Sequence, residues 1–136
     1  MVPQLALIIM SYVFDSNILI YYLNSALPDT GRQLVGQGIR RTSYISVVTR
    51  IEILCGIDKA IPIPQPVTDL LNQFREQPFT EAIIQQCIDI RRNQRIKLPD
   101  AIIAATALHL QLPLVTRNID DFKNIETLAT INPFDL

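Results

Sequence analysis

Short apolar segments alternate with longer segments of helical periodicity along most of the chain. Apolar runs predict β-strands at residues 12–14, 44–46, 113–116 and 128–131, the last at an edge of the sheet, with a further short strand near Phe79. Helices are predicted between them at residues 17–23, 47–59, 67–75, 81–92 and 99–110, together with one that opens at residue 30. Because strands alternate with helices, we expect an α/β fold whose parallel sheet is covered on both faces.

Local signals set the predicted ends of several helices. Pro99 suits the first position of a helix, because its fixed φ is helical and the N–H that it lacks would be unpaired there. The Thr-Gly-Arg-Gln segment at residues 30–33 has capping-box spacing, and Gly36 and Gly38 predict the end of the helix that it opens. The proline-rich loop at residues 62–66 ends the preceding helix and is too short to be a domain linker.

Composition places the chain among globular proteins. Its 136 residues are typical of one domain, so we expect residues 1–136 to form a single unit. Hydrophobic residues make up 49% and charged residues 18%, and a net charge of -1 excludes a global basic field for nucleic acid. Cys55 and Cys87 lack CxxC spacing and are interpreted as reduced core thiols of a cytoplasmic protein.

The N-terminal segment contains an apolar run at residues 5–10. The run is too short to span a bilayer and lacks the basic lead and cleavage site of a signal peptide, so no membrane association is expected. If Met10 is the true start, the residues before it are an upstream extension; otherwise residues 1–10 lead into the first strand.

Polar residues follow three of the predicted strands. Asp15, Ser46 and Asn118 each stand at or just beyond a strand end, where sites form in open α/β sheets. Asp100 opens the helix that feeds the strand before Asn118. Glu52 lies two turns into its helix among apolar neighbours, where a charge is costly unless it is paired or bound to a metal. These side chains are therefore expected to converge on one edge of the sheet.

The acidic residues also have structural explanations. Asp15 can cap the next helix, although Ser16 can do so instead and leave the carboxylate free. Asp100 can offset the dipole of the helix that it opens, and Glu52 can lie on a solvated helix face.

The turn after the 113–116 strand has its own structural alternative. Asn118 can cap this turn, with Asp121 reaching back as in a capping box, and Asp120 is interpreted as a solvated loop charge. His109, the one histidine, stands nine residues after Asp100 and therefore on the opposite face of the helix. No serine or cysteine hydrolase triad and no glycine-rich phosphate loop is supported.

The remaining chemistry is that of a cluster of oxygen ligands. Carboxylates suit Mg²⁺ or Mn²⁺, and the matching reaction is hydrolysis of a phosphodiester, in which the metal lowers the pKa of a bound water. A nucleic-acid strand needs cations nearby, and these also suit a solvated helix C-terminus. The candidates for contacts with such a strand are Arg91, Arg92, Arg95, Lys97 and Arg117.

Four stretches resemble the PIN domain and, within it, the VapC-type toxin ribonucleases. They are FDSNIL at residues 14–19, the helix segment from Ser46 to Glu52, LPDAIIAATA at residues 98–107, and LVTRNIDDF at residues 114–122. The similarity extends from residue 12 to about residue 133. It implies a PIN-like α/β/α sandwich and a Mg²⁺- or Mn²⁺-dependent endoribonuclease.

The resemblance also implies roles for particular residues. The acidic residues of the family correspond to Asp15, Glu52 and Asp100, which would be the catalytic metal ligands. The fourth acidic position falls on Asn118, and Asp121 is the candidate to replace it. This departure puts a second metal in doubt.

Further implications concern supporting residues and partners. Ser46 and Thr116 match family positions that hold the carboxylates by hydrogen bonds. The family relationship also implies a homodimer, a small antitoxin protein and an RNA substrate. Two alternatives stay open: a catalytically weak or inactive PIN domain that binds RNA or protein, and an α/β scaffold whose carboxylates are only caps.

Overall fold

The computed structural model describes residues 11–136, so the predictions for residues 1–10 lie outside the described part of the chain. Its strands are β1 (Val13–Phe14), β2 (Tyr44–Ser46), β3 (Arg75–Gln77), β4 (Leu114–Val115) and β5 (Thr130–Ile131). Its helices are α2 (Ser16–Leu23), α3 (Asp29–Arg40), α4 (Val47–Cys55), α5 (Gln65–Leu71), α6 (Glu81–Asn93), α7 (Leu98–Leu110) and the 3₁₀ helix η1 (Ile119–Phe122). None of these helices is long and apolar enough to cross a membrane.

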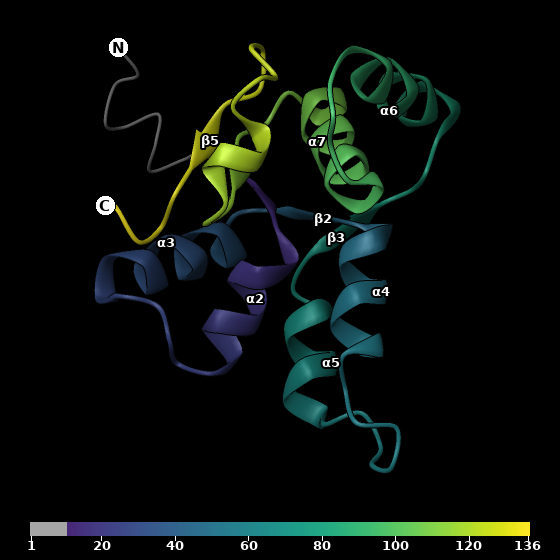
Figure 1. The fold of residues 1–136 in the computed structure, drawn as a ribbon. Helices are drawn as coiled ribbons and strands as arrows, with labels where there is room; N and C mark the ends of the chain where they lie inside the picture. Colours follow the sequence, from purple (N-terminus) through teal and green to yellow (C-terminus); the bar gives the residue numbers. More distant parts are fainter. Residues whose placement is uncertain (1–10) are drawn as a thin grey trace.

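The five strands form one sheet in the order β3-β2-β1-β4-β5, and every neighbouring pair is parallel. Side chains alternate across the sheet: Val13 and Leu114 face a core built with α6 and α7, whereas Phe14 and Val115 face a second core built with α2, α3 and α5. The two groups of helices lie on opposite sides of the sheet (Figure 1). The predicted α/β sandwich is therefore confirmed, and β5 is an edge strand as predicted.

Helix α3 corrects one prediction. It begins at Asp29 without a side-chain cap and continues through both glycines to Arg40. A Cβ at Gly38 would lie 2.7 Å from the Phe14 ring, so this glycine lets the helix pack closely on β1. That packing outweighs the cost of about 1 kcal/mol that glycine carries within a helix.

Two other boundaries were predicted wrongly. Helix α4 ends at Cys55 with Gly56 as its C-cap, several residues before the proline loop. The helix predicted at residues 67–75 ends at Leu71, residues 75–77 form strand β3 beside β2, and Phe79 lies outside any strand. Arg50 of α4 pairs with Glu76, which ties this short edge strand to the helix after β2.

Helix α7 is packed as its sequence predicts. It has a proline in its first turn, and its alanines at positions 101, 104, 105 and 107 are fully buried, which allows close approach to the sheet and to α6. His109 is exposed near its end, as predicted. Both cysteines are free; Cys87 is buried, but Cys55 is exposed, so the prediction of a core position fails for Cys55.

Candidate active site

Asp15 lies at the carboxyl end of β1, in the middle of the sheet, and is only 5% exposed. Its Oδ1 atom accepts a hydrogen bond of 2.7 Å from the backbone N–H of Ser16, and its Oδ2 atom accepts one of 2.8 Å from the hydroxyl of Thr116. Asp15, and not Ser16, therefore caps α2. The hydrogen bond predicted from Thr116 to a carboxylate is present.

Burial dominates the electrostatics of this carboxylate. The pKa of Asp15 is raised from 3.8 to about 6, chiefly because a buried charge loses its hydration. Repulsion by Asp100 and Glu52 contributes to this rise, and the hydrogen bonds from Thr116 and Ser16 oppose it. Asp15 is therefore close enough to both other acidic residues to interact with their charges, as the sequence predicted.

Glu52 reaches the site from α4, which packs against α2. Its Oε1 atom accepts a hydrogen bond of 2.7 Å from the hydroxyl of Ser16. The side chain is exposed, so the expectation of a charge held on an apolar, desolvated helix face is wrong. Of the residues one turn away, Thr49 is fully buried and Val48 partly buried, whereas Cys55 and Gly56 are exposed.

Ser16 was missed as a residue of this site, and Ser46 was assigned a role that the structure does not show. The Ser46 hydroxyl accepts a hydrogen bond of 3.1 Å from the backbone N–H of Val48, so it caps α4. Within residues 11–136 it makes no hydrogen bond to a carboxylate. Both serines adjoin a strand end and a helix start, and the sequence spacing did not distinguish the two.

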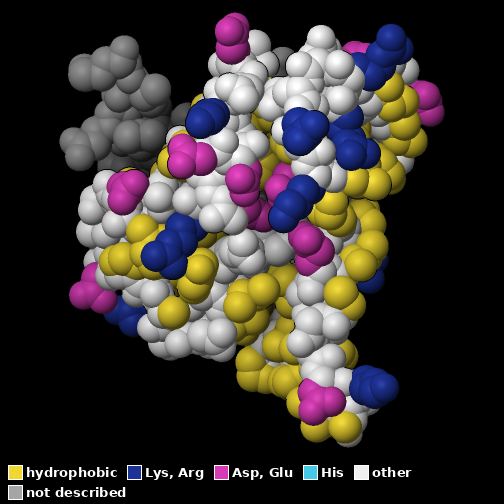
Figure 2. All heavy atoms as spheres, in the orientation of Figure 1, with side chains coloured by type: hydrophobic (Ala, Val, Ile, Leu, Met, Phe, Trp, Pro, Cys, Tyr) yellow, Lys and Arg dark blue, Asp and Glu magenta, His cyan; other side chains and the backbone are white. Residues whose placement is uncertain are grey.

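Asp100 stands in the first turn of α7 and is partly buried. Burial raises its pKa, as does repulsion by Asp121 and Glu52, whereas Lys97 lowers it. Asp100 and Asp121 line the same hollow, which has a volume of about 470 Å³. Figure 2 shows acidic side chains gathered near the centre of this face, with basic side chains beside them.

Asn118, just before η1, and Asp121, within it, line different sets of hollows. Asn118 makes no side-chain capping bond, so the predicted cap is absent; its backbone N–H donates to the Thr116 hydroxyl at 3.1 Å. Its side chain is exposed and lines a neighbouring hollow of about 540 Å³, not the one that contains Asp100. Asp121 lines both hollows. Asp121 is therefore the better placed of the two to act with Asp100.

The predicted RNA-contact residues divide into two groups. Arg91, Arg95 and Lys97 line the hollow with Asp100, whereas Arg92 is exposed outside its lining. Arg91 also donates a hydrogen bond of 3.2 Å to the carbonyl of Ile96, which fixes the turn between α6 and α7.

Arg117 contacts two aromatic side chains of the protein itself. Its guanidinium lies 4.0 Å from the ring centroid of Phe134 and 5.3 Å from that of Tyr21, and it donates a hydrogen bond of 3.1 Å to the Tyr21 hydroxyl. Its side chain thus links α2 to the C-terminal segment. An RNA contact by Arg117 would have to share the guanidinium with these rings.

The chemistry of the donor set fits a hydrated divalent cation. The ion pairs among residues 11–136 are Arg32–Asp29 and Arg50–Glu76, so none of the site carboxylates is neutralised by one. No three Asp, Glu, His or Cys side chains of residues 11–136 form a ready-made metal cage. Mg²⁺ usually takes only one or two carboxylates and completes its shell with water and substrate phosphate, which suits this open arrangement.

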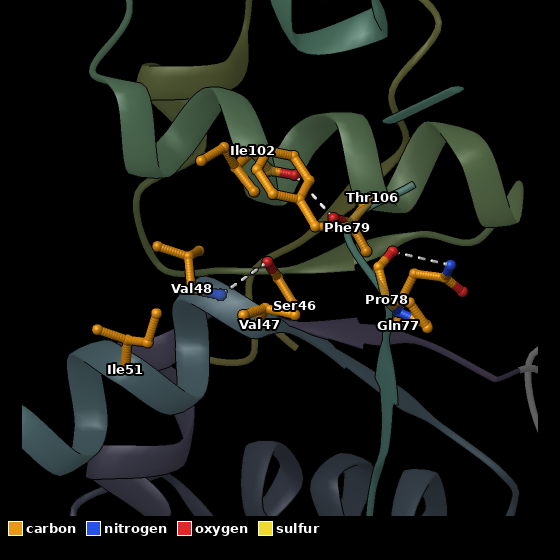
Figure 3. A pocket seen from close by; sticks show the side chains of 9 residues that line it. All are labelled: Ser46, Val47, Val48, Ile51, Gln77, Pro78, Phe79, Ile102 and Thr106. Carbon is orange, nitrogen blue, oxygen red and sulfur yellow. Dashed lines mark hydrogen bonds between the residues drawn. The ribbon is translucent and has the colours of Figure 1, made fainter. Parts of the chain in front are cut away.

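A third hollow, which is apolar and has a volume of about 100 Å³, lies between α4, α7 and the segment after β3. Val48 and Ile51 line it from α4, Phe79 from the segment after β3, and Ile102 from α7 (Figure 3). Ile51 is 56% and Phe79 49% exposed. Two of the helices that carry site carboxylates therefore also present an apolar surface.

A parallel sheet of this order with acidic residues at its carboxyl edge defines a class of protein. The model of the PIN domain matches residues 12–128, and the chain belongs to the PIN domain family.

Three individual proteins are similar to this chain over most of its length. The chain is 35% identical to Ribonuclease VapC10 of Mycobacterium tuberculosis over 119 residues, which are 84% of this chain and 87% of that protein. It is similar to a chain of a toxin-antitoxin complex from Klebsiella pneumoniae, with a TM-score of 0.75 and 29% identity over 93% of this chain and all of that chain. DNA-bound VapBC from Salmonella typhimurium shares the fold, with a TM-score of 0.76 at 20% identity over 91% of this chain and 98% of that chain.

Proposed function

We propose that this protein is a Mg²⁺- or Mn²⁺-dependent endoribonuclease that acts in the cytoplasm as the toxin of a type II toxin-antitoxin pair. The observation that carries the proposal is the convergence of Asp15, Glu52, Asp100 and Asp121 on one edge of the sheet without a neutralising ion pair. The similarity to a named ribonuclease supports the proposed RNA cleavage, and the similarity to a chain of a toxin-antitoxin complex supports the proposed toxin role.

The proposed mechanism assigns distinct tasks to the residues of the site. Asp15 and Asp100, with Glu52 beside them, would hold the cation, and Asp121 would replace the fourth acid. When bound, the cation would lower the pKa of a water and neutralise negative charge on the phosphoryl oxygens. Thr116 keeps the Asp15 carboxylate oriented by its hydrogen bond of 2.8 Å.

The basic residues of the hollow would position the substrate. Arg91, Arg95 and Lys97 line it together with Asp100 and Asp121, so an RNA phosphate can contact these cations beside the carboxylates that would hold the metal. With a protein of net charge -1, this local group supplies the attraction that the overall charge does not.

The proposal also includes two protein partners. The similarity to a chain of a toxin-antitoxin complex favours a small antitoxin, which co-expression of the adjacent reading frame would test through suppression of RNA cleavage. The apolar hollow and the exposed Phe79 and Ile51 lie on one face and supply both a cavity and projecting side chains. A two-fold homodimer needs such a self-complementary patch.

The alternative function is an inactive PIN domain that binds RNA or protein without cleaving it. The asparagine at position 118 favours it, because this residue stands at the fourth acidic position of the family. Glu52→Gln and Asp100→Asn separate the two functions, with Asp120→Asn as the control, because Asp120 lines the same hollow but does not affect the pKa of Asp100.

The experiment measures RNA cleavage with Mn²⁺ and the Mn²⁺-induced rise in melting temperature. We expect both site variants to lose more than about tenfold in cleavage and most of the rise in melting temperature, while the control retains both. Absence of cleavage by the wild-type protein with a normal Mn²⁺ response would favour the binding module. Equal cleavage by all three variants would remove these carboxylates from the reaction.

A further inference from the structure

Ser16 contacts two carboxylates of the site with two different groups. Its backbone N–H donates to Asp15 Oδ1 at 2.7 Å, and its hydroxyl donates to Glu52 Oε1, also at 2.7 Å. The two bonds join the end of β1 to the middle of α4, 36 residues away along the chain.

Ser16 and Glu52 differ in how freely their side chains can move. Ser16 is 5% exposed, and its backbone is fixed in the first turn of α2 by the Asp15 cap. Glu52 is exposed and stands on a helix surface, where a long side chain has several accessible rotamers. A bond from a fixed, buried hydroxyl selects among these rotamers, so the position of the Glu52 carboxylate depends on Ser16.

We propose that Ser16 is a positioning residue of the metal site, which holds Glu52 for the cation through its hydroxyl. This inference rests on the proposed function, since it concerns the same metal site. Asp15 does not depend on the hydroxyl, because its bond to residue 16 uses the backbone N–H. Loss of the hydroxyl should therefore act through Glu52 alone.

The test is a double-mutant cycle on Mn²⁺ affinity, measured by calorimetry on the full chain without RNA. Ser16→Ala keeps the backbone N–H and so keeps the cap of α2. We expect it to weaken Mn²⁺ binding about tenfold, the lower end of the range for residues that orient metal ligands. In a Glu52→Gln background the same change should have no further effect, and Ser16→Thr should restore affinity by returning the hydroxyl.

Thr49→Val is the matched control. Thr49 lies one turn before Glu52, is fully buried, and has a side-chain oxygen without a hydrogen-bond partner within residues 11–136. Removal of that hydroxyl should leave Mn²⁺ affinity unchanged. A fall in affinity with Thr49→Val equal to that with Ser16→Ala would show a general packing effect and overturn the inference.

The remaining outcomes distinguish failure of the inference from failure of the proposed function. If the wild-type protein binds Mn²⁺ and Ser16→Ala binds it equally well, Ser16 has no positioning role. If Ser16→Ala weakens binding by the same factor with and without Glu52, the serine does not act through that carboxylate. If the wild-type protein binds no Mn²⁺, the metal site itself is refuted and the inference falls with it.

Discussion

Asp15→Asn should change how the stability of the protein depends on pH. The native carboxyl group has a pKa of about 6, against 3.8 for an exposed aspartate. Between these values the folded state holds a proton that the unfolded state releases, so the free energy of unfolding falls as pH rises from about 4 to about 6. At about 1.4 kcal/mol for each pH unit, the loss is about 3 kcal/mol in the absence of metal.

The asparagine variant has no charge to bury and therefore lacks this fall. It keeps an oxygen for the backbone N–H of Ser16, but its amide cannot accept the hydrogen bond from Thr116 as the carboxylate oxygen does, a loss of about 1 kcal/mol. We therefore expect the variant to be less stable than the wild-type protein near pH 4, and more stable by about 2 kcal/mol above pH 7. The two stability profiles should cross.

The assay is urea unfolding in EDTA at intervals from pH 4.5 to pH 7.5, for both proteins. Asp100, whose pKa is also raised, acts in the same direction in both, so the difference between the curves reports Asp15 together with its repulsion of Asp100. Addition of Mn²⁺ at pH 7.5 should stabilise only the wild-type protein strongly, by RT ln(1+[L]/Kd). Parallel pH profiles that differ by a constant would refute the reasoning, because Asp15 would then titrate alike in both states.

Three further predictions concern other parts of the molecule. Asp121→Asn should weaken the Mn²⁺-induced rise in melting temperature, whereas Asn118→Asp should preserve or increase it; the reverse order would make position 118 the fourth acidic site. Gly38→Ala should lower the free energy of unfolding by about 1–3 kcal/mol, since its Cβ would meet the ring of Phe14 at 2.7 Å; an unchanged urea midpoint would contradict this packing. Phe79→Glu should shift the mass measured by light scattering from dimer to monomer, and a wild-type protein that is already monomeric would exclude the proposed homodimer.

The order of elements was predictable because it depends on periodicity and strand-end signals. Asp15 ends a buried strand, and Pro99 marks the start of the helix that carries Asp100. The sequence alone therefore placed these two acidic residues near one edge of the sheet. The boundaries failed where tertiary packing outweighs local propensity. Gly38 remains helical because the ring of Phe14 needs its missing Cβ, and residues 75–77 form a strand because β2 offers them a partner.

The detailed contacts of the site were less predictable. Ser16 and Ser46 both stand between a strand and a helix, and only the packing of α2 against α4 decides which hydroxyl meets Glu52. Likewise, the stacking of Arg117 on Phe134 joins residues that no local pattern connects. The types of residue needed for the chemistry can be read from a sequence, whereas side-chain partners depend on the three-dimensional arrangement of helices.

The hydrogen bond between Asp15 and Thr116 spans 101 residues, and strand β4, which precedes Thr116, pairs directly with β1. During synthesis on the ribosome, β1 therefore lacks one of its two neighbouring strands until the residues of β4 have been made. Contacts of this kind form late in folding, because the intervening segment must be closed first. A nascent chain that ends before Thr116 leaves Asp15 without this anchor. If the protein cleaves RNA as proposed, we expect it not to cut the message that encodes it before Thr116 has been synthesised.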